Sequence, residues 1–487
     1  MENLTNNNSK STLVPPSGDR GLVVIGGGPG GYAAAFYAAD LGMNVTLVDL
    51  EKNPGGVCLY RGCIPSKALL HVAKLINETK EAKAWGVDFG EPKIDIDQLR
   101  TFKNKVVAKL TGGLGVLSKQ RKINFVQGRA KFASSKSIVV TKEDGSLQEI
   151  SYDKAIIAIG SVIATVPSLQ IDSNRLLNST SALDLPTIPK SLLVVGGGYI
   201  GLELGSVYAA LGTKVSVVEF MDRILPGADQ DLVSHLQKRL SHSFEKIMLQ
   251  SKVTEIKEVG EGLTVKIENK DGVTEEQQYD YVLMSIGRKP QTAGLGLENT
   301  NVQVNVRGWI IVDKTLKTND ENIYAIGDIV GEPMLAHKAS HEARVAVDSI
   351  LGKKVAFEPL AIPAVVFTDP EIAWAGITEN QANATGVKYE VAKFPWAASG
   401  RATTLDRSDG LTKIIVDPET ERVLGVGLCG PGAGELIAEA VLAIEMGATV
   451  KDLALTIHPH PTLSETVMEA AELFYGHSSH LYKPAKK

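Results

Sequence analysis

Two cysteines separated by four residues, Cys58 and Cys63, stand between a glycine-rich segment and a predicted helix. A pair of thiols at this spacing can exchange two electrons with a disulfide or with a redox cofactor. The helix is predicted over IPSKALLHVAKLINETK, whose apolar residues recur at helical spacing and whose Pro65 suits a first turn. Cys63 would therefore lie at a helix N-terminus, where the backbone dipole favours a thiolate. Arg61 and Lys67 add positive charge nearby.

The other roles for this pair are a zinc site, a structural disulfide or two unrelated buried thiols. A structural zinc site needs about four ligands, and no second cysteine pair with zinc-finger spacing exists. The chain has 3 cysteines in 487 residues, which excludes a disulfide scaffold. Cys429 has no cysteine near it in sequence and is predicted to be a small core residue. The spacing alone leaves redox and structural roles open.

Length and composition are those of a multidomain globular enzyme. A chain of 487 residues is too long for one core and suggests about three or four domains. The formal net charge of -5 gives no basic surface for nucleic acid, and no apolar run reaches the ~18 residues that span a membrane. Residues 1–20 are predicted to form a flexible polar tail. A dithiol that must cycle fits a reducing compartment, so we expect a cytoplasmic protein.

A glycine-rich turn follows the first predicted strand. Residues 22–25 (LVVI) form a buried strand that runs into GGGPGG, and a helix and a second strand ending at Asp49 follow. In a dinucleotide-binding fold, Gly26 permits the tight turn, Gly28 lets the backbone approach a pyrophosphate, and Gly31 allows close helix packing. Asp49, 23 residues after Gly26, is placed to bond a ribose hydroxyl.

The same arrangement recurs later in the chain. Residues 192–195 lead into GGGYIG at 196–201, and a helix and a strand ending at Glu219 follow. Glu219 again stands 23 residues after the first glycine of its motif, Gly196. A single motif of this kind also serves plain strand-to-helix packing, but two complete copies predict two dinucleotide sites.

Two segments further along the chain carry polar residues at the ends of predicted elements. TNDENIYAIGDIV is predicted to be a strand ending at Gly327 and Asp328, followed by the helix MLAHKASHEARVAVDSIL. An acid there suits either a sugar or ribityl hydroxyl or a simple helix cap. Near the C-terminus, HPHPTLSE places Glu465 five residues after His460, close enough to orient its imidazole. His460 can also be a surface or capping residue, and a metal role with His458 lacks further ligands nearby.

Together these motifs resemble one family, the flavoprotein disulfide reductases of the class I pyridine nucleotide-disulfide oxidoreductases. The matching runs are, in order, GGVCLYRGCIPSKALLH, GGGYIGLELGSVYAALG, AIGDIVGEPMLAHKA, FPWAASGRA and HPHPTLSE. The resemblance implies an α/β fold class, with two Rossmann-like FAD/NAD(P)-binding domains and a C-terminal α+β dimerisation domain. The implied boundaries are 21–161 for the FAD-binding domain, 162–286 for the NAD-binding domain, 287–355 for a central domain that completes the FAD site, and 356–487 for the dimerisation domain.

The resemblance also implies a role for each matching residue. Cys58 would meet the substrate, and Cys63 would face the flavin. Lys67 and Glu203 would pair beside the flavin. His460 would be the acid–base, oriented by Glu465 and supplied by the other subunit of a homodimer. The implied FAD contacts are Gly26, Gly28, Gly31, Asp49, Lys67, Ala130, Ile159, Gly160, Ser161, Asp328, Met334, Leu335, Ala336 and His337. The implied NAD contacts are Gly196, Gly198, Tyr199, Ile200, Gly201, Glu203, Glu219, Val253 and Gly287, and no metal ion is implied.

Family members with these motifs oxidise dihydrolipoamide, so the resemblance implies NAD⁺-dependent reoxidation of protein-bound dihydrolipoamide to lipoamide. The implied partner is the lipoyl-bearing acyltransferase of a 2-oxo acid dehydrogenase complex or a glycine-cleavage carrier protein, with no role for nucleic acid or a membrane. The alternative is a nucleotide-bound scaffold without turnover. The intact set of Cys58, Cys63, His460 and Glu465 argues against that alternative.

Three positions depart from the pattern of the family. Tyr60-Arg61 stands where relatives often carry Asn-Val, which leaves the redox potential of the thiol pair open. Asp49 replaces the more usual glutamate and should still reach a ribose hydroxyl. Tyr199 resembles the tyrosine that covers the nicotinamide pocket in glutathione reductase-like members, so we expect it to gate that pocket.

Glu219 predicts the choice of nicotinamide cofactor. We expect kcat/KM to be at least ~100-fold higher with NAD⁺ than with NADP⁺, because a carboxylate at this position repels a 2′-phosphate. Steady-state rates with each cofactor measure the ratio. Comparable rates would show that Arg223, predicted here to be a solvated charge, or another residue binds the phosphate.

Overall fold

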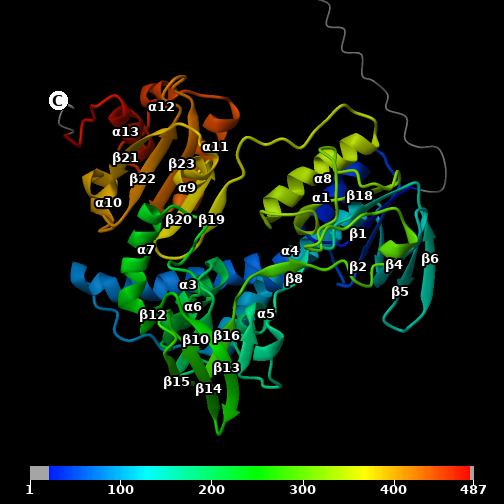
Figure 1. Ribbon diagram of the computed structural model, residues 1–487, viewed down its shortest axis with the longest axis horizontal. Helices are drawn as coiled ribbons and strands as arrows, with labels where there is room; N and C mark the ends of the chain where they lie inside the picture. The colour runs from blue at the N-terminus through cyan, green and yellow to red at the C-terminus, as the bar shows by residue number, and fades with distance from the viewer. Residues whose placement is uncertain (1–20, 483–487) are drawn as a thin grey trace, which may run out of the picture. The chain divides into compact units, whose positions relative to one another are not determined.

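The computed structural model describes residues 21–482, so the predicted tail at 1–20 lies outside the described residues. The described chain divides into two compact units, each assembled from three separate stretches of sequence (Figure 1). The first unit holds residues 21–60, 108–162 and 289–358, and the second holds 61–107, 163–288 and 359–482. Four of the five boundaries fall within α2 (Gly56–Arg61), α4 (Ile96–Gln120), β8 (Ser161–Ile163) and β17 (Arg288–Pro290), and the fifth follows Glu358 in a loop. The domain boundaries implied by the resemblance stay predictions.

The first unit is built on a five-stranded parallel sheet in the order β18-β7-β1-β2-β3. Helices α1 and α8 lie side by side (Figure 1), and Gly30 of α1 lets Ala339 of α8 approach closely. A second sheet, β4-β5-β6, is antiparallel. The bounds are β1 (Leu22–Ile25), α1 (Pro29–Asp40), β2 (Val45–Asp49), β3 (Asn124–Gln127), β4 (Arg129–Ser134), β5 (Ser137–Thr141), β6 (Leu147–Ser151), β7 (Lys154–Ile157), β18 (Ile323–Ala325) and α8 (Ala336–Ile350).

The second unit contains a five-stranded parallel sheet, β12-β11-β10-β16-β9, and an antiparallel sheet, β13-β14-β15. The bounds in this part are α3 (Cys63–Glu81), β9 (Leu176–Asn178), α5 (Ser179–Leu183), β10 (Ser191–Val195), α6 (Tyr199–Ala210), β11 (Lys214–Val218), α7 (Gln230–Ser243), β12 (Lys246–Met248), β13 (Lys252–Val259), β14 (Gly262–Glu268), β15 (Thr274–Tyr279) and β16 (Tyr281–Met284).

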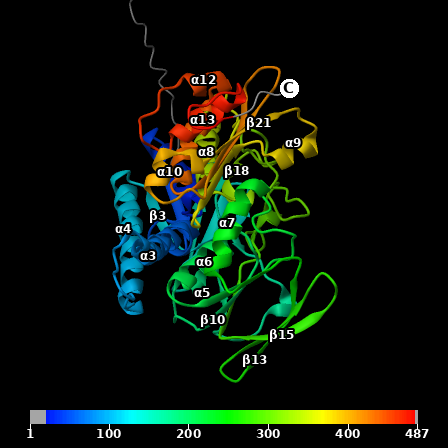
Figure 2. The ribbon, with the colours of Figure 1, turned by 90° about the vertical axis from the view of Figure 1, so that its left-hand side faces the viewer.

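The C-terminal part of the second unit is an antiparallel sheet, β19-β20-β23-β22-β21, with helices against it. Figure 2 shows α12 and α13 together beside β21. The bounds are β19 (Ala364–Val366), β20 (Glu371–Gly376), α9 (Glu379–Thr385), β21 (Glu390–Pro395), α10 (Gly400–Thr404), β22 (Leu411–Val416), β23 (Val423–Gly430), α11 (Ala433–Glu445), α12 (Val450–Leu455) and α13 (Glu465–Phe474). The predicted α/β fold class with a C-terminal α+β part is confirmed.

Both glycine-rich turns have the geometry that the sequence predicts. Gly26 has φ +101° and Gly196 has φ +109°, a backbone region that favours glycine. A Cβ on Gly31 would lie 1.7 Å from the carbonyl oxygen of Gly26, and a Cβ on Gly201 would lie 2.3 Å from that of Gly196. Only glycine at these positions lets each helix begin directly against the strand before it.

Helix α3 is held by its packing on α6. Its buried residues Leu69, Ala73 and Ile76 are four and three positions apart, so they share one face of the helix and belong to the same apolar core as Leu202 of α6. This packing fixes the N-terminal turn of α3, which carries Cys63.

Several predicted element boundaries needed small corrections. The strand predicted to end at Gly327 and Asp328 ends at Ala325 (β18), and Gly327–Ile329 form a short 3₁₀ turn instead. Helix α8 begins at Ala336 rather than Met334, because Leu335 is its extended N-cap, with φ −128° and ψ 135°. Strand β11 ends at Val218, and Glu219 follows it directly. Strands β5 and β6 form a hairpin, with Gly145 at φ +79° in its turn.

Candidate active site

The two thiols lie on consecutive helices. Cys58 is half-buried on α2, and Cys63 is the exposed first residue of α3, with Gly62 as the N-cap. The predicted placement of Cys63 at a helix start is therefore confirmed. Backbone N–H groups at a helix N-terminus favour negative charge, so this position stabilises a thiolate more than a thiol.

Lys67 lies one turn after Cys63 and pairs with Glu203 of α6, as predicted. The Nζ atom of Lys67 is 2.8 Å from the Oε2 atom of Glu203. Only 3% of the Glu203 surface is exposed, whereas the Lys67 side chain is 32% exposed. The ammonium group therefore has one side held by the buried carboxylate and another side open.

Two further partners of this pair were not predicted from the sequence. The hydroxyl of Ser66 donates to Oε2 of Glu203 at 3.1 Å, and the backbone N–H of Phe367 donates to Oε1 at 3.0 Å. The Phe367 ring also lies 4.5 Å from the Lys67 ammonium, within range of a cation–π contact. Ser66 is the neighbour of Lys67 in sequence, so its contact with Glu203 could have been expected. Phe367 directly follows β19, and nothing in the sequence around it predicts a contact with Glu203.

The two glycine turns leave open space where their second glycines lie. A Cβ on Gly28 would have its nearest neighbour at 3.9 Å, the Cα atom of Gly56, and one on Gly198 would meet nothing within 4 Å. The helix N-termini behind these turns present backbone N–H groups toward that space. Both turns therefore fit the pyrophosphate of a dinucleotide.

The acids after the second strands are arranged alike in the two turns. Gly27 donates its N–H to Oδ2 of Asp49 at 2.5 Å, and Gly197 donates to Oε2 of Glu219 at 2.6 Å. The other carboxylate oxygens accept the N–H groups of Glu51 and Met221 at 2.8 and 2.7 Å. A carboxylate oxygen has two lone pairs, so one that accepts an N–H is also able to accept a ribose hydroxyl.

The other predicted FAD contacts of the first unit come from several strands and helix starts. Ile159 lies beside the Gly26 turn, since a Cβ on Gly26 would be 3.0 Å from its Cα atom. The Ser161 hydroxyl donates to Oδ2 of the half-buried Asp328 at 2.5 Å. Among the rest, Gly160 has φ +70°, Ala130 is buried on β4, Met334 and Leu335 precede α8, and Ala336 and His337 begin it.

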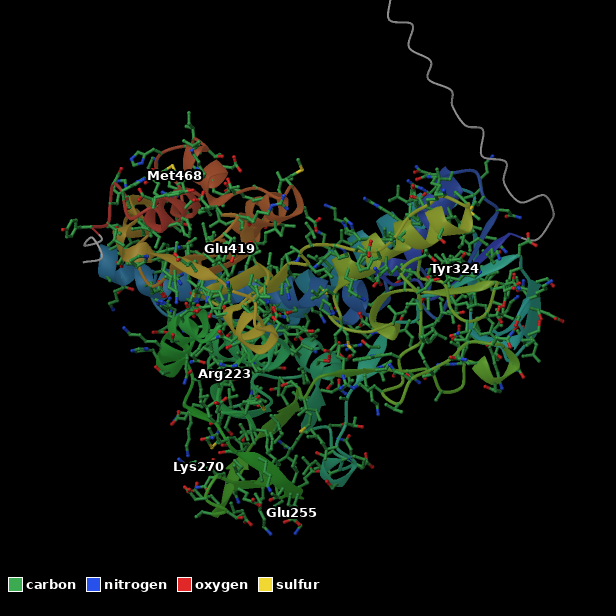
Figure 3. All side chains as sticks on the ribbon, turned by 45° about the horizontal axis from the view of Figure 1, so that its top comes forward. Arg223, Glu255, Lys270, Tyr324, Glu419 and Met468 are labelled. Atoms are coloured by element: carbon green, nitrogen blue, oxygen red, sulfur yellow. The ribbon has the colours of Figure 1, made fainter. Side chains whose placement is uncertain are left out.

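The predicted NAD contacts belong to the second unit. Tyr199 and Ile200 begin α6, and the Tyr199 side chain is 41% exposed. Val253 lies on β13, and Gly287, with φ +111°, follows β16. Arg223, labelled in Figure 3, lies in the loop after β11 and is half-buried, so it is less solvated than the sequence predicted.

His460 and Glu465 form the contact that their spacing predicts. The Nδ1 atom of His460 is 2.9 Å from Oε1 of Glu465, the first residue of α13, and the N–H of Thr462 donates to Oε2 at 2.7 Å. Burial raises the pKa of Glu465, but the Thr462 N–H and the His460 ring outweigh it and hold that pKa below its usual value. The His460 side chain is 69% exposed, so its ring is oriented from one side and accessible from the other.

His458 has a different setting. Its Nδ1 atom is 2.8 Å from the carbonyl oxygen of Thr456, and its Nε2 atom is 2.8 Å from Oε1 of Glu439. The side chain is 5% exposed. With both ring nitrogens held by protein groups, His458 supports the loop that carries His460.

A cluster of acids in the second unit is neutralised by lysine. Asp229, Asp231 and Glu379 are close enough to share a cation. The buried Nζ atom of Lys413 lies 2.7, 3.0 and 2.6 Å from their oxygens, and these acids raise its pKa against the effect of burial. The cluster is therefore a structural ion network.

Comparison with known families matches nearly the whole described chain. Residues 20–343 match the family described as pyridine nucleotide-disulphide oxidoreductase, and residues 362–471 match its dimerisation domain. The chain belongs to the pyridine nucleotide-disulphide oxidoreductase family. The predicted flavoprotein oxidoreductase with FAD and NAD as cofactors is confirmed by this membership. Within residues 21–482, no helix is long and apolar enough to cross a membrane.

Within this family, the chain is similar to dihydrolipoyl dehydrogenases over nearly its full length. The dihydrolipoyl dehydrogenase of Vibrio parahaemolyticus is 50% identical over 96% of this chain and 97% of its own. That of Geobacillus stearothermophilus is 44% identical over 94% of this chain and 97% of its own. Among solved structures, LpdA from Mycobacterium tuberculosis has a TM-score of 0.85 at 30% identity, covering 93% of this chain and 99% of its own. The flavoprotein disulfide reductase RclA from Escherichia coli has a TM-score of 0.83 at 30% identity, covering the same shares.

The contact between His460 and Glu465 predicts the effect of removing the carboxylate. We expect Glu465→Gln to lower kcat/KM at least tenfold, since acid–base groups contribute about 10²–10⁴-fold and depend on their orientation. Steady-state oxidation of dihydrolipoamide with NAD⁺ measures the change. Glu439→Gln makes the same change beside His458 and serves as the matched control. We expect nearly unchanged kcat/KM, because the amide oxygen can still accept from the His458 ring and His458 is not the acid–base group. Equal losses in the two variants would contradict a special role for Glu465.

Proposed function

We propose that this chain reoxidises protein-bound dihydrolipoamide to lipoamide and reduces NAD⁺ to NADH, the dihydrolipoyl dehydrogenase reaction. The observation that carries the proposal is the thiol at the start of α3 in a chain that matches dihydrolipoyl dehydrogenases over nearly its full length. The oriented ring of His460 adds the acid–base group that thiol exchange needs.

The cysteines carry out the exchange with the substrate. His460 takes the proton of one substrate thiol, and the resulting thiolate attacks the sulfur of Cys58 in a Cys58–Cys63 disulfide. The bond between the two cysteines breaks, and Cys63 leaves as a thiolate that the N-terminus of α3 stabilises. The second substrate thiol then loses its proton to solvent and attacks the substrate sulfur of the mixed disulfide, which closes the lipoamide ring and releases Cys58 as a thiolate. The two electrons of the substrate now reside on the cysteine pair.

The glycine turns and their acids hold the two cofactors. The residues around Gly26 and Asp49, with Ser161 and Asp328, bind FAD, and those around Gly196 and Glu219 bind NAD. Bound FAD supplies the chemistry that takes two electrons from the dithiol and delivers them as a hydride to NAD⁺. Glu203 holds the ammonium group of Lys67 on α3, one helix turn after Cys63. The domain boundaries implied by the resemblance assign these roles to residues 21–161, 162–286 and 287–355.

The working enzyme is a homodimer that receives His460 from the partner subunit. Support comes from the match of residues 362–471 to a dimerisation domain, which includes both His460 and Glu465. The lipoyl group arrives on the acyltransferase of a 2-oxo acid dehydrogenase complex or on a glycine-cleavage carrier protein. A reducing cytoplasm is the compartment in which such a dithiol can cycle.

Mixed dimers test the shared site directly. Cys63→Ser and His460→Ala homodimers should each be inactive or strongly impaired while keeping FAD. A heterodimer of the two variants contains one site with an intact cysteine pair and an intact histidine, provided that the histidine comes from the partner. We therefore expect dihydrolipoamide turnover to return to a substantial fraction of that of one normal site.

The outcome separates the alternatives. Purified heterodimers that stay as inactive as their parents would show that His460 acts within its own chain or has no catalytic role. Full activity of the Cys63→Ser homodimer would refute the redox pair. Cys429→Ala is the matched cysteine control, because Cys429 is buried in the core, and its turnover should be close to that of the unmodified protein.

A further inference from the structure

Helix α8 carries a buried ion pair, Lys338 with Glu342, whose burial the sequence does not predict. Lys338 and Glu342 are four residues apart, a spacing that usually gives an exposed pair on a helix. Here their side chains are only 6% and 2% exposed, and Nζ of Lys338 lies 2.7 Å from Oε1 of Glu342. Burying two charges is costly unless further hydrogen bonds satisfy them, so the other partners of this pair show what it holds.

Both members of the pair reach the peptide groups of one turn. Oε2 of Glu342 accepts the backbone N–H of Gly327 at 2.6 Å. Nζ of Lys338 lies 3.4 Å from the carbonyl oxygens of Gly327 and Gly331, at the long end of hydrogen bonding. The ion pair therefore contacts both polar groups of the Gly327 backbone: Glu342 accepts its N–H, and Lys338 donates to its carbonyl oxygen.

Strand pairing does not hold the N–H of Gly327, because Gly327 lies beyond the end of β18. It follows β18 and has φ +81°, a left-handed conformation that takes its N–H out of the ladder. A Cβ on Gly327 would lie 3.2 Å from the Cβ atom of Ala339, so α8 presses directly against the turn. Tyr324 on β18, labelled in Figure 3, belongs to the apolar core that α8 also joins.

The turn presents Asp328 to the surface. Asp328 is half-buried between the buried residues Gly327 and Ile329, and Ser161 donates to its carboxylate at 2.5 Å. Because Asp328 directly follows Gly327, fixing the Gly327 peptide group also fixes the backbone of Asp328. Burial raises the pKa of Glu342, while Lys338 and the Gly327 N–H act to lower it, so the carboxylate depends on both partners to stay ionised.

We propose that Lys338 and Glu342 are positioning residues for FAD, which fix the Gly327 turn and through it the carboxylate of Asp328. This inference rests on the proposed contact of Asp328 with the cofactor. The pair acts through the hydrogen bond from Gly327 to Glu342, so an acceptor at position 342 matters more than the two charges.

Two double variants separate that hydrogen bond from the ion pair. Lys338→Met with Glu342→Gln removes both charges but keeps an oxygen that can accept the Gly327 N–H. Lys338→Met with Glu342→Met removes both charges and the acceptor, with side chains of similar length. The exposed pair Lys74 and Glu78 on α3 has the same spacing, and replacing both residues by Met provides the matched control.

Cofactor retention is the readout. FAD per chain is measured by absorbance after gel filtration, and the dissociation constant by flavin fluorescence during titration of the apoprotein. Apparent melting temperatures of the apoproteins report fold stability separately. We expect the Met/Met variant at 338 and 342 to bind FAD at least ~10-fold more weakly, the Met/Gln variant to stay within about threefold, and the α3 control to be unchanged.

Several results would overturn the proposal. Unchanged FAD affinity in the Met/Met variant would refute it, as would equal weakening in both double variants that follows their apoprotein melting temperatures. If the Met/Met chain does not fold, Glu342→Asp keeps the charge and shortens the reach, and undiminished FAD affinity there would have the same consequence. Absence of FAD from the unmodified protein would contradict the use of FAD by this chain, on which the proposed contact of Asp328 depends.

Discussion

The hydrogen bonds to the buried carboxylate of Glu203 are the constraint that joins the separate stretches of the second unit. Glu203 lies on α6 and accepts hydrogen bonds from Lys67 and Ser66 on α3 and from Phe367 at the end of β19. Three stretches of the unit that are far apart in sequence therefore meet at one side chain that is 3% exposed. A buried carboxylate left without these partners would be strongly unfavourable, so the constraint orders all three stretches together.

This constraint links the fold to the chemistry. Because α3 is fixed against α6, the helix N-terminus that favours a thiolate and the ammonium group of Lys67 keep a constant relation to Cys63. The first unit has a comparable constraint at Gly327, where a buried ion pair on α8 holds the turn that carries Asp328. In each unit a buried carboxylate links elements that carry a site residue. Glu203 does so through the side chains of Ser66 and Lys67 and the N–H of Phe367, and Glu342 does so through the N–H of Gly327.

The site features that the residues predict without the family resemblance are local ones, whereas the pairing of Lys67 with Glu203, 136 residues away, is expected only from that resemblance. The glycine turns at Gly26 and Gly196, the helix start at Cys63 and the contact of His460 with Glu465 each depend on residues a few positions apart or on a motif of fixed length. Phe367 could not be predicted, because it reaches Glu203 from 164 residues away through sheet packing. Lys338 and Glu342 have the spacing of an exposed helical pair, and only the packing of α8 reveals their burial.

The proposed reaction is the oxidation of a dithiol with NAD⁺ rather than the reduction of a disulfide with NADPH. Purified protein should be assayed in parallel for NAD⁺ reduction by dihydrolipoamide and for NADPH oxidation by glutathione disulfide, with bound FAD confirmed in the same sample. We expect rapid NADH formation in the first assay and negligible turnover in the second. Efficient glutathione disulfide reduction with NADPH, without dihydrolipoamide oxidation, would contradict the proposed reaction.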